Sequence, residues 1–329
     1  MSSYRPWGLL DWALSISDSR EWNFIGAIGT EERSLSALNW VRELGSLKST
    51  SMVKVDPMRG TRYYSKTQVQ LAERLSQFQL LGVEDPDVLS IELLAELHEI
   101  ESLAADLSKR GSAIILDITS FPKRFFFPLL RTLIKNVEVR DLVVAYGCPK
   151  TYLDGEKLSE GAGKWDYLPG FLGKELGSDV LIASVGFMVE SLQDYLSSAE
   201  AHPAVQLLMP FPSNPTSVRR AWESIISLQN NRSGEKFVKH RLDANDISMA
   251  FDRICSLSRS KESVSFAPFG PKPISAAMCL YAAQIESAVH YPQPESYHPD
   301  YSKGVASVDG KPFVNGYWIK HNGNNLYSI

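Results

Sequence analysis

Residues 114–124 read IILDITSFPKR, and residues 264–273 read VSFAPFGPKP. Each stretch begins with an apolar run typical of a buried strand, continues through a short turn that ends in Pro-Lys, and leads into a segment with helical periodicity. The two lysines, Lys123 and Lys272, lie 272 − 123 = 149 residues apart. The recurrence predicts that the chain contains two related α/β halves and that a functional site is paired.

Other landmarks recur at similar intervals. Gly29 and Gly186 each follow an expected strand and are separated by 186 − 29 = 157 residues. Tyr146 and Tyr291 each end an expected strand and are separated by 291 − 146 = 145 residues. The alternation of strands with helices predicts parallel strands joined by right-handed crossovers. We therefore expect each half to be a Rossmann-like, doubly wound unit with a mainly parallel sheet.

The expected organisation has three parts. Residues 1–147 form the first Rossmann-like half, with a helical insertion at about 65–109. Residues 148–178 are a Gly/Lys-rich loop or connection, for which a ligand-covering role is one interpretation because long loops in compact proteins are often functional. Residues 179–329 form the second half, which ends in a β-hairpin built around Asn322-Gly323.

Composition limits the classes of function. The 329 residues are 44% hydrophobic, enough for a substantial core, and the net charge of −4 provides no global basic field for binding long nucleic acids strongly. We find neither a secretion signal nor an apolar run of about eighteen residues, so the sequence predicts a cytoplasmic chain without a membrane partner. Three scattered cysteines indicate neither disulfides nor a metal site, and we expect no cofactor.

The first candidate segment is the turn after the expected strand 22–28. Gly29 allows close approach of the backbone to a ligand, Thr30 can cap the next helix, and Arg33 has a planar guanidinium suited to phosphate or carboxylate. The alternative is a capped helix with surface charges.

The second candidate segment is the turn after residues 114–117. Asp117 suits a ribose hydroxyl, an acid/base role, or simply the bracing of its own turn. Thr119 and Ser120 supply hydroxyl groups, and Lys123 and Arg124 supply charge for a phosphate.

The second half has Phe266 where this alignment puts Asp117, but it retains Lys272 and gains Gly270, which permits close backbone approach. A lysine in the first turn of a helix opposes the helix dipole unless an anion is present, so Lys123 and Lys272 both favour anion binding. Tyr146 and Tyr291 either stack on a base or belong to the core. Further polar segments follow Gly186 and occupy the loop 212–214. The loop from Tyr297 to Gly304 is expected to close over the ligand crevice at the carboxyl ends of the strands.

Motifs of common enzyme classes are absent from the sequence. It contains no Walker A sequence, GxGxxG, GxSxG or HExxH. Asp117, Glu31 and His290 remain candidate general bases, and nothing in the sequence selects one of them. Whether the protein is an enzyme therefore stays open.

The turn Asp117-Ile118-Thr119-Ser120-Phe121-Pro122-Lys123, and more loosely Gly270-Pro271-Lys272, resembles the strand-to-helix turn of the CARF and related Rossmann-like ligand-sensing domains of prokaryotic defence systems. The resemblance implies paired domains that bind a cyclic oligonucleotide across their dyad. The turn departs from the family pattern at Phe121-Pro122, where a glycine is usual, and the second copy lacks the acidic and hydroxyl residues. Neither end shows a recognisable effector domain, which implies a separate effector protein.

The leading hypothesis from the sequence is a nucleotide-binding or cyclic-oligonucleotide-binding sensor, with a separate effector or a homo-oligomer as partner. Lys123, Arg124 and Lys272 are expected to contact phosphates. One alternative is an enzyme acting on a nucleotide or nucleoside, with Asp117 or Glu31 as acid/base group and residues 147–178 as a lid. A second alternative is a protein-interaction scaffold.

Overall fold

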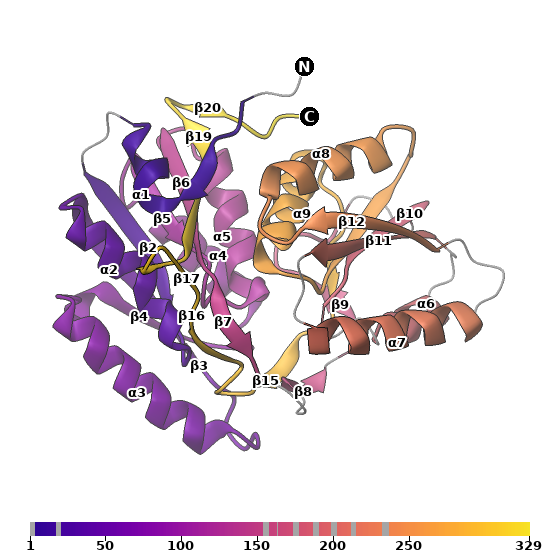
Figure 1. Cartoon of the computed structure of the whole chain (residues 1–329), viewed down its shortest axis with the longest axis horizontal. Coiled ribbons are helices and arrows are strands. Elements are labelled where there is room, and N and C mark those ends of the chain that lie inside the picture. The colour runs from indigo at the N-terminus through magenta and orange to yellow at the C-terminus, as the bar shows by residue number, and fades with distance from the viewer. Residues whose placement is uncertain are drawn as a thin grey trace. The chain divides into compact units, whose positions relative to one another are not determined.

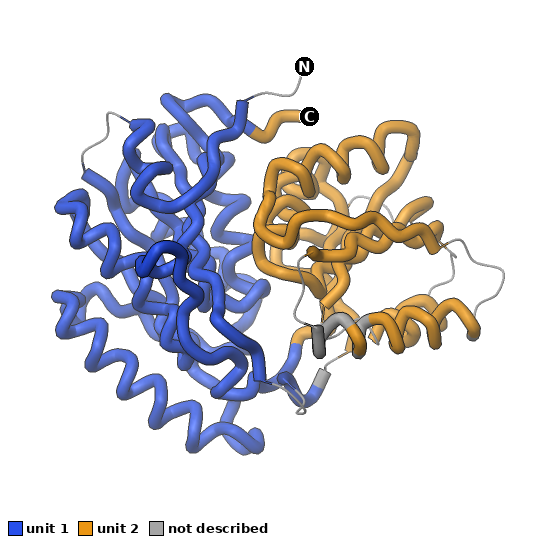
Figure 2. Tube along the Cα trace, in the orientation of Figure 1, with its two compact units in different colours: residues 1, 3–162, 294–326 blue, residues 2, 163–293, 327–329 orange. Residues whose placement is uncertain are grey.

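The computed structural model describes residues 4–17, 21–153, 158–162, 164–173, 178–186, 191–198, 203–211, 215–231 and 237–329. The chain divides into two compact units (Figure 2). Unit 1 comprises residues 3–162 and 294–326, and unit 2 comprises residues 163–293 and 327–329. Unit 2 is thus inserted into unit 1. Its boundaries at residues 163 and 293 differ from the expected division at residues 147 and 179.

Unit 1 is built on a mainly parallel sheet (Figure 1). Its strand order is β1-β19-β6-β5-β2-β3-β4, and β20 pairs with β19. The strands β2 to β6 are mutually parallel; in chain order this row reads 3-2-1-4-5 from the β4 edge. This order matches the first five strands of the Rossmann order, 3-2-1-4-5-6. The bounds are β1 (Trp7–Leu9), β2 (Trp22–Ile28), β3 (Leu47–Asp56), β4 (Val88–Glu92), β5 (Ala113–Asp117), β6 (Asp141–Gly147), β19 (Val314–His321) and β20 (Asn324–Asn325).

Helices cover both faces of the unit 1 sheet (Figure 1). The strands β2, β5 and β6 are buried along their whole length, as their almost continuous apolar sequences predict. On one face, side chains such as Trp22, Phe24 and Trp318 form a core with α1, α2 and α3. On the other face α4 packs against α5. The bounds are α1 (Leu10–Ser15), η1 (Glu32–Leu35), α2 (Ser36–Glu43), α3 (Tyr64–Leu80), η2 (Asp85–Asp87), α4 (Leu97–Leu107) and α5 (Lys123–Lys135).

Two predictions about unit 1 need correction. The expected helical insertion at 65–109 contains a strand, β4, between α3 and α4, and β4 extends the sheet beyond β3. The terminal hairpin does not belong to the second half. Its long strand β19 lies between β1 and β6 and is antiparallel to both. The strand is almost entirely buried, so its backbone groups need hydrogen-bond partners on both edges.

The segment 148–178 is not a plain loop. Three short strands within it form two-stranded ribbons with the segment after residue 289: β7 (Pro149–Tyr152) with β16 (Ser302–Val305), β8 (Ser159–Ala162) with β15 (Pro294–Tyr297), and β9 (Asp166–Tyr167) with β14 (His290–Tyr291). A further ribbon joins β17 (Ser307–Val308) and β18 (Lys311–Pro312). The partners are more than a hundred residues away in sequence for the first three ribbons, which explains why local patterns did not indicate them.

Unit 2 has a parallel sheet with the order β12-β11-β10-β13. Val289 adds a parallel bridge to Phe266 of β13, so this row also reads 3-2-1-4-5 in chain order. The shared order is what the predicted duplication requires. The bounds are β10 (Val180–Ser184), α6 (Leu192–Ser198), β11 (Ala204–Phe211), α7 (Pro215–Asn231), β12 (Phe237–Asp243), α8 (Ile247–Ser258), β13 (Val264–Pro268) and α9 (Lys272–Ile285).

Candidate functional site

The chain reverses its direction across the unit 1 sheet between β2 and β5. From β2 the sheet grows through β3 to β4, and the next strand in the chain, β5, then pairs with the other side of β2. Ligands of open parallel sheets bind beyond the carboxyl ends of the strands at such a reversal. The turns that follow Ile28 and Asp117 therefore define the candidate site, and they carry most of the residues singled out from the sequence.

Gly29 packs against the turn that follows β5. A Cβ atom on Gly29 would lie 2.6 Å from both Cβ and Oγ of Ser120, so any other residue here would force the Ser120 turn to shift. The Ser120 Oγ atom is buried and has no hydrogen-bond partner among the described residues. A buried polar group without a partner costs about 1–3 kcal/mol. The close approach expected of Gly29 is thus made to Ser120, whose hydroxyl keeps its hydrogen-bonding capacity at the site.

Asp117 braces its own turn. Its side chain is 2% exposed, and its Oδ1 atom accepts a hydrogen bond of 2.9 Å from the backbone amide of Thr119. The Thr119 hydroxyl in turn accepts a hydrogen bond of 2.7 Å from the amide of Gly147 at the end of β6. These bonds tie together the turns after β5 and β6. They favour the bracing role for Asp117 over the ribose-binding and acid/base roles.

Arg33 and Glu31 form a buried ion pair beside this turn. Nε and Nη2 of Arg33 donate to the two carboxylate oxygens of Glu31 at 2.9 and 3.1 Å, and Nη1 donates to the Gly147 carbonyl at 2.9 Å. Burial is the largest single influence on Arg33 and opposes its charge, but the Glu31 carboxylate, together with Tyr146 and Tyr152, raises the pKa of Arg33 above its ordinary value. Arg33, which was expected to bind phosphate, and Glu31, which was considered as a general base, therefore form an ion pair with each other.

Aromatic side chains enclose the ion pair. The guanidinium carbon lies 5.5 Å from the ring centroid of Tyr146, and the rings of Tyr152 and Tyr301 meet edge to face at 5.9 Å. The Ser302 hydroxyl donates to the carboxylate of the pair. Burial raises the pKa of all three phenols, which therefore stay neutral at physiological pH. Tyr146 is a core residue, the second of the two roles considered for it.

The loop from Tyr297 to Gly304 is fastened to α3 within unit 1. Asp300 accepts hydrogen bonds from Lys66 Nζ at 2.5 Å and from Gln70 Nε2 at 2.8 Å. The ring of His298 packs edge to face against Tyr63 at 4.6 Å. Lys66, Gln70 and Tyr152 were not predicted from the sequence, because each meets its partner only after the chain has returned from unit 2. The Tyr-rich composition of the loop was the one available signal.

Lys123 and Arg124 begin α5, and Pro122 precedes them at the N-cap position. Proline offers no side-chain acceptor for the first helical amides, and no capping side chain is seen in the described part of the chain. Arg124 Nη2 donates to the Ala95 carbonyl at 2.7 Å, which anchors α5 to the turn before α4. Lys123 is half-buried, and burial lowers the pKa of its amino group to about 7.

Unit 2 repeats this local geometry. A Cβ atom on Gly186, which follows β10, would lie 1.9 Å from the carbonyl oxygen of Phe269, and the Gly270 amide donates to Ser184 Oγ at 2.8 Å. Lys272 begins α9 behind Pro271, whose φ and ψ of −54° and 149° match the −58° and 149° of Pro122. The repeated strand, Pro-Lys step and helix are therefore present in both units.

An aromatic cluster occupies unit 2 near the carboxyl end of β13. Tyr195 Oη and His290 Nε2 lie 3.2 Å apart, and the Trp165 ring lies 4.7 Å from that of Tyr195. Burial lowers the pKa of His290 to about 4, so this ring is neutral at physiological pH. Tyr291, expected as a ligand residue, is 4% exposed and lies 6.3 Å from the Phe269 ring, in the core.

The predicted residues thus fall into two groups, one in each unit. Unit 1 brings together Gly29, Thr30, Glu31, Arg33, Asp117, Thr119, Ser120, Lys123 and Arg124, and unit 2 holds Gly186, Gly270, Lys272 and Tyr291. The polar segments 187–190 and 212–214 lie outside the described residues. Among the described residues, we find no group of His, Cys, Asp and Glu side chains that could hold a metal ion. None of the described helices combines the length and apolar character needed to cross a bilayer.

No family model and no curated protein matches the chain. Similar solved structures include a universal stress protein from Archaeoglobus fulgidus, at 10% identity and a TM-score of 0.23, covering 83% of this chain and 96% of that protein. An N-terminal ketoreductase from a macrolactin assembly line shows 12% identity and a TM-score of 0.22, over 72% of this chain and 50% of the other. The ketoreductase from the first module of phoslactomycin biosynthesis in Streptomyces sp. HK803 shows 11% identity and a TM-score of 0.23, over 86% and 67%. At these scores the site geometry, rather than any neighbour, has to support a function.

Proposed function

We propose that unit 1 binds a nucleotide-type ligand through a phosphate group placed at the N-terminus of α5. The observation that carries this proposal is the buried Ser120 hydroxyl, which lacks a hydrogen-bond partner among the described residues. It lies three residues before Lys123, at a helix start without a capping side chain in the described chain. Backbone amides at a helix start, a hydroxyl and an amino group are the donors that phosphate oxygens accept.

The other polar residues of the site act as its scaffold. Asp117 and Thr119 hold the turn, Arg33 is paired with Glu31, and Arg124 is bonded to the Ala95 carbonyl. This division of roles narrows the expectation from the sequence, in which all of these residues were ligand candidates. It also weakens the enzyme alternative, because both of its carboxylates, Asp117 and Glu31, serve the structure.

The electrostatics of Lys123 support an anionic ligand. Burial makes the charged form of this lysine unfavourable, which lowers its pKa to about 7. A phosphate beside the amino group would favour the charged form and raise the pKa again. Binding at alkaline pH would then take up a proton, and the affinity would fall by up to tenfold for each pH step above about 7.

Within this class we propose a cyclic oligonucleotide as the ligand and a sensor role in a prokaryotic defence system, working with a separate effector or as a homo-oligomer. The shared 3-2-1-4-5 strand order and the matched helix starts at Lys123 and Lys272 support an origin by duplication. The two turns are related but unequal, because the turn in unit 2 lacks the acidic and hydroxyl residues of the first. The resemblance to CARF domains implies a ligand with repeated phosphates, and each unit has a Pro-Lys helix start suited to a phosphate.

Isothermal titration calorimetry against mononucleotides and cyclic oligonucleotides tests the proposal. Phosphodiester ligands are preferable because their charge does not change near neutral pH. We expect binding by the wild type, at least tenfold weaker binding by Lys123→Met and Ser120→Ala, and unchanged binding by Lys135→Met, which alters an exposed lysine at the far end of α5. No binding by the wild type, or equal binding by Lys123→Ala combined with Lys272→Ala, would refute it.

A further inference from the structure

The strand β12 leaves one edge of the unit 2 sheet open in the described part of the chain. It lies at the end of the strand order and pairs with β11. The Ala244 amide donates to the Phe211 carbonyl at 2.8 Å. In a parallel ladder only alternate residues bond to the same neighbour, so Val238, His240 and Leu242 face β11 with their backbone groups. The N–H and C=O groups of Lys239 and Arg241 therefore point away from the sheet.

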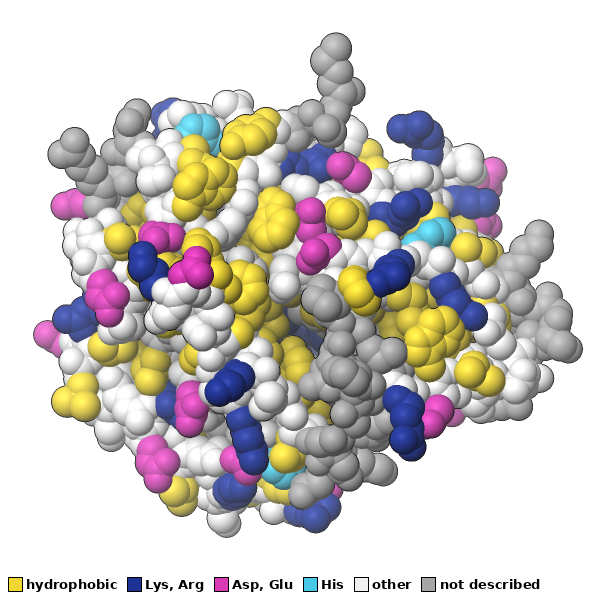
Figure 3. All heavy atoms as spheres, viewed as in Figure 1, with side chains coloured by type: hydrophobic (Ala, Val, Ile, Leu, Met, Phe, Trp, Pro, Cys, Tyr) yellow, Lys and Arg dark blue, Asp and Glu magenta, His cyan; other side chains and the backbone are white. Residues whose placement is uncertain are grey.

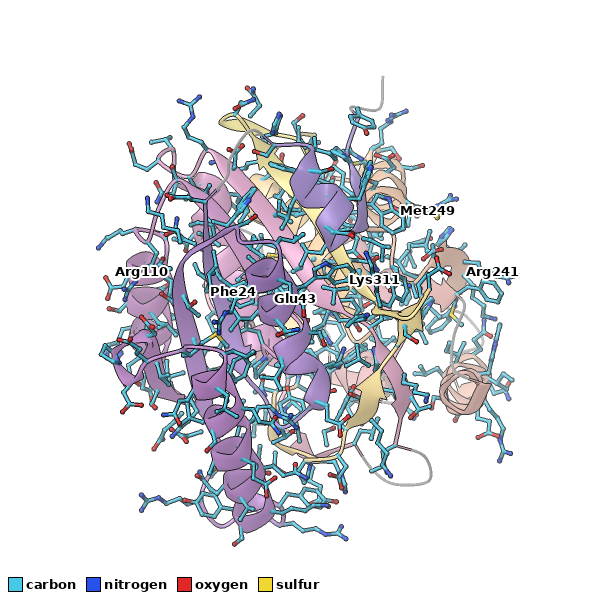
Figure 4. The ribbon with its side chains drawn as sticks, turned by 60° about the vertical axis from the view of Figure 1, so that its left-hand side comes forward. Phe24, Glu43, Arg110, Arg241, Met249 and Lys311 are labelled. Carbon is cyan, nitrogen blue, oxygen red and sulfur yellow. The ribbon has the colours of Figure 1, made fainter. Side chains whose placement is uncertain are left out.

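Apart from Asp243 at its end, the side chains along this edge are cationic and partly apolar. Val238 is 42% exposed. The guanidinium of Arg241 lies 3.4 Å from the ring centroid of Phe211, and the Lys239 amino group lies 5.2 Å from that of Trp222. Lys and Arg side chains lie beside apolar ones over the α7 and β12 side of unit 2 (Figure 3), and Arg241 is at the surface (Figure 4). Lys239 Nζ also donates to Gln229 Oε1 at 2.8 Å, so neighbouring side chains hold both cations in place.

The strand β4 forms an edge of the unit 1 sheet, and its charge is opposite. The Leu93 amide donates to the Asp56 carbonyl at 2.9 Å, so by the same alternation Leu89 and Ile91 face β3 with their backbone groups. Ser90 and Glu92, which are exposed, direct theirs outward. Acidic residues precede the strand at Glu84, Asp85 and Asp87.

We propose that β4 of one copy of this chain adds to the β12 edge of a second copy. In antiparallel pairing, Glu92 stands opposite Lys239 and Ser90 stands opposite Arg241. All four residues have outward backbone groups, so both pairs exchange N–H···O bonds, and the whole of β4 is matched by residues 239–243. Glu92 and Lys239 then share a face as an opposite-charge cross-strand pair. Pairing of β12 with its own copy would instead oppose Lys239 and Arg241.

Edge strands often carry charges that prevent association. Here the charges of the two edges are opposite, and this complementarity favours association over protection of the edges. Each copy offers one acidic and one basic edge, and the contact is head-to-tail rather than two-fold symmetric. It follows that each copy can join two others. This association is independent of the phosphate site in unit 1.

A charge exchange tests the proposal on the full chain by sedimentation velocity at low and high salt. We expect the wild type to associate at low salt and to dissociate as salt screens the pair. Glu92→Lys alone places lysines on both edges, and Lys239→Glu alone places acids on both, so each variant should be monomeric. An equimolar mixture of the two restores an opposite-charge pair at every junction and should associate like the wild type. Circular dichroism and thermal melting check that each variant is folded.

A second variant separates backbone pairing from charge. Arg241→Pro removes an outward N–H without removing a bond to β11 and should reduce association more than Arg241→Gln does. A wild type that stays monomeric at every concentration at low salt overturns the proposal. So does association that both single charge variants leave intact, or a mixture that associates no more than its components.

Discussion

Lys123 should make the stability of unit 1 depend on pH in an unusual direction. Its pKa is lowered by burial from 10.5 to about 7, so the unfolded chain holds this proton over a pH range in which the folded chain does not. The free energy of unfolding therefore rises with pH between about 7 and 10.5. The cost of keeping the buried charge is fully present below about pH 7 and corresponds to about 5 kcal/mol before solvent screening of the half-buried side chain is included.

The variant Lys123→Met tests this dependence, because it keeps the length of the side chain and removes its charge. Urea unfolding should show the variant to be more stable than the wild type at about pH 6, with a difference that shrinks by up to about 1.4 kcal/mol for each pH step above 7. Lys135→Met is the matched control on the same helix, and its difference from the wild type should stay constant. Parallel pH profiles for wild type and Lys123→Met would show that burial does not perturb this lysine.

Two further changes test the scaffold of the site, both by urea unfolding. Gly29→Ala should cost about 1–3 kcal/mol because its Cβ would lie 2.6 Å from Ser120, and Ser120→Gly should remove most of that cost; equal losses in both backgrounds would contradict the contact. Glu31→Gln should cost about 3–5 kcal/mol because it leaves the buried Arg33 without its counter-charge, whereas Glu31→Gln combined with Arg33→Met should cost less; a double variant as unstable as the sum of the singles would contradict the ion pair.

The fold class could be predicted because its evidence is local. The strand β2 spans the predicted residues 22–28, and the helices α5 and α9 begin at the Pro-Lys steps. These elements carry their own apolar runs, turns and helix starts. The mixed α/β architecture with a mainly parallel sheet is confirmed, whereas duplication remains a prediction that the common strand order supports.

The parts that were missed depend on distant partners. The strand β4 has only five residues, of which two are exposed, and it lies between helices, so its apolar signal is weak. The insertion of β19 beside β6 joins residues that are about 170 apart, which no local pattern can indicate. In the candidate site the position of Asp117 was predicted. The Glu31–Arg33 pair was not, because it is completed by hydrogen bonds with Ser302 and Gly147, which lie far away in the sequence.

The insertion of β19 between β1 and β6 has a consequence for synthesis on the ribosome. Unit 1 cannot close its sheet until residues 314–321 have emerged, although most of its other strands are made before residue 148. The inserted unit, whose sheet is complete once Val289 has been made, can fold first during translation. A nascent chain that stops short of β19 would expose the edges of both β1 and β6. Chaperone demand should therefore persist until β19 has been made, and a deletion of residues 314–321 would remove an interior strand of the sheet.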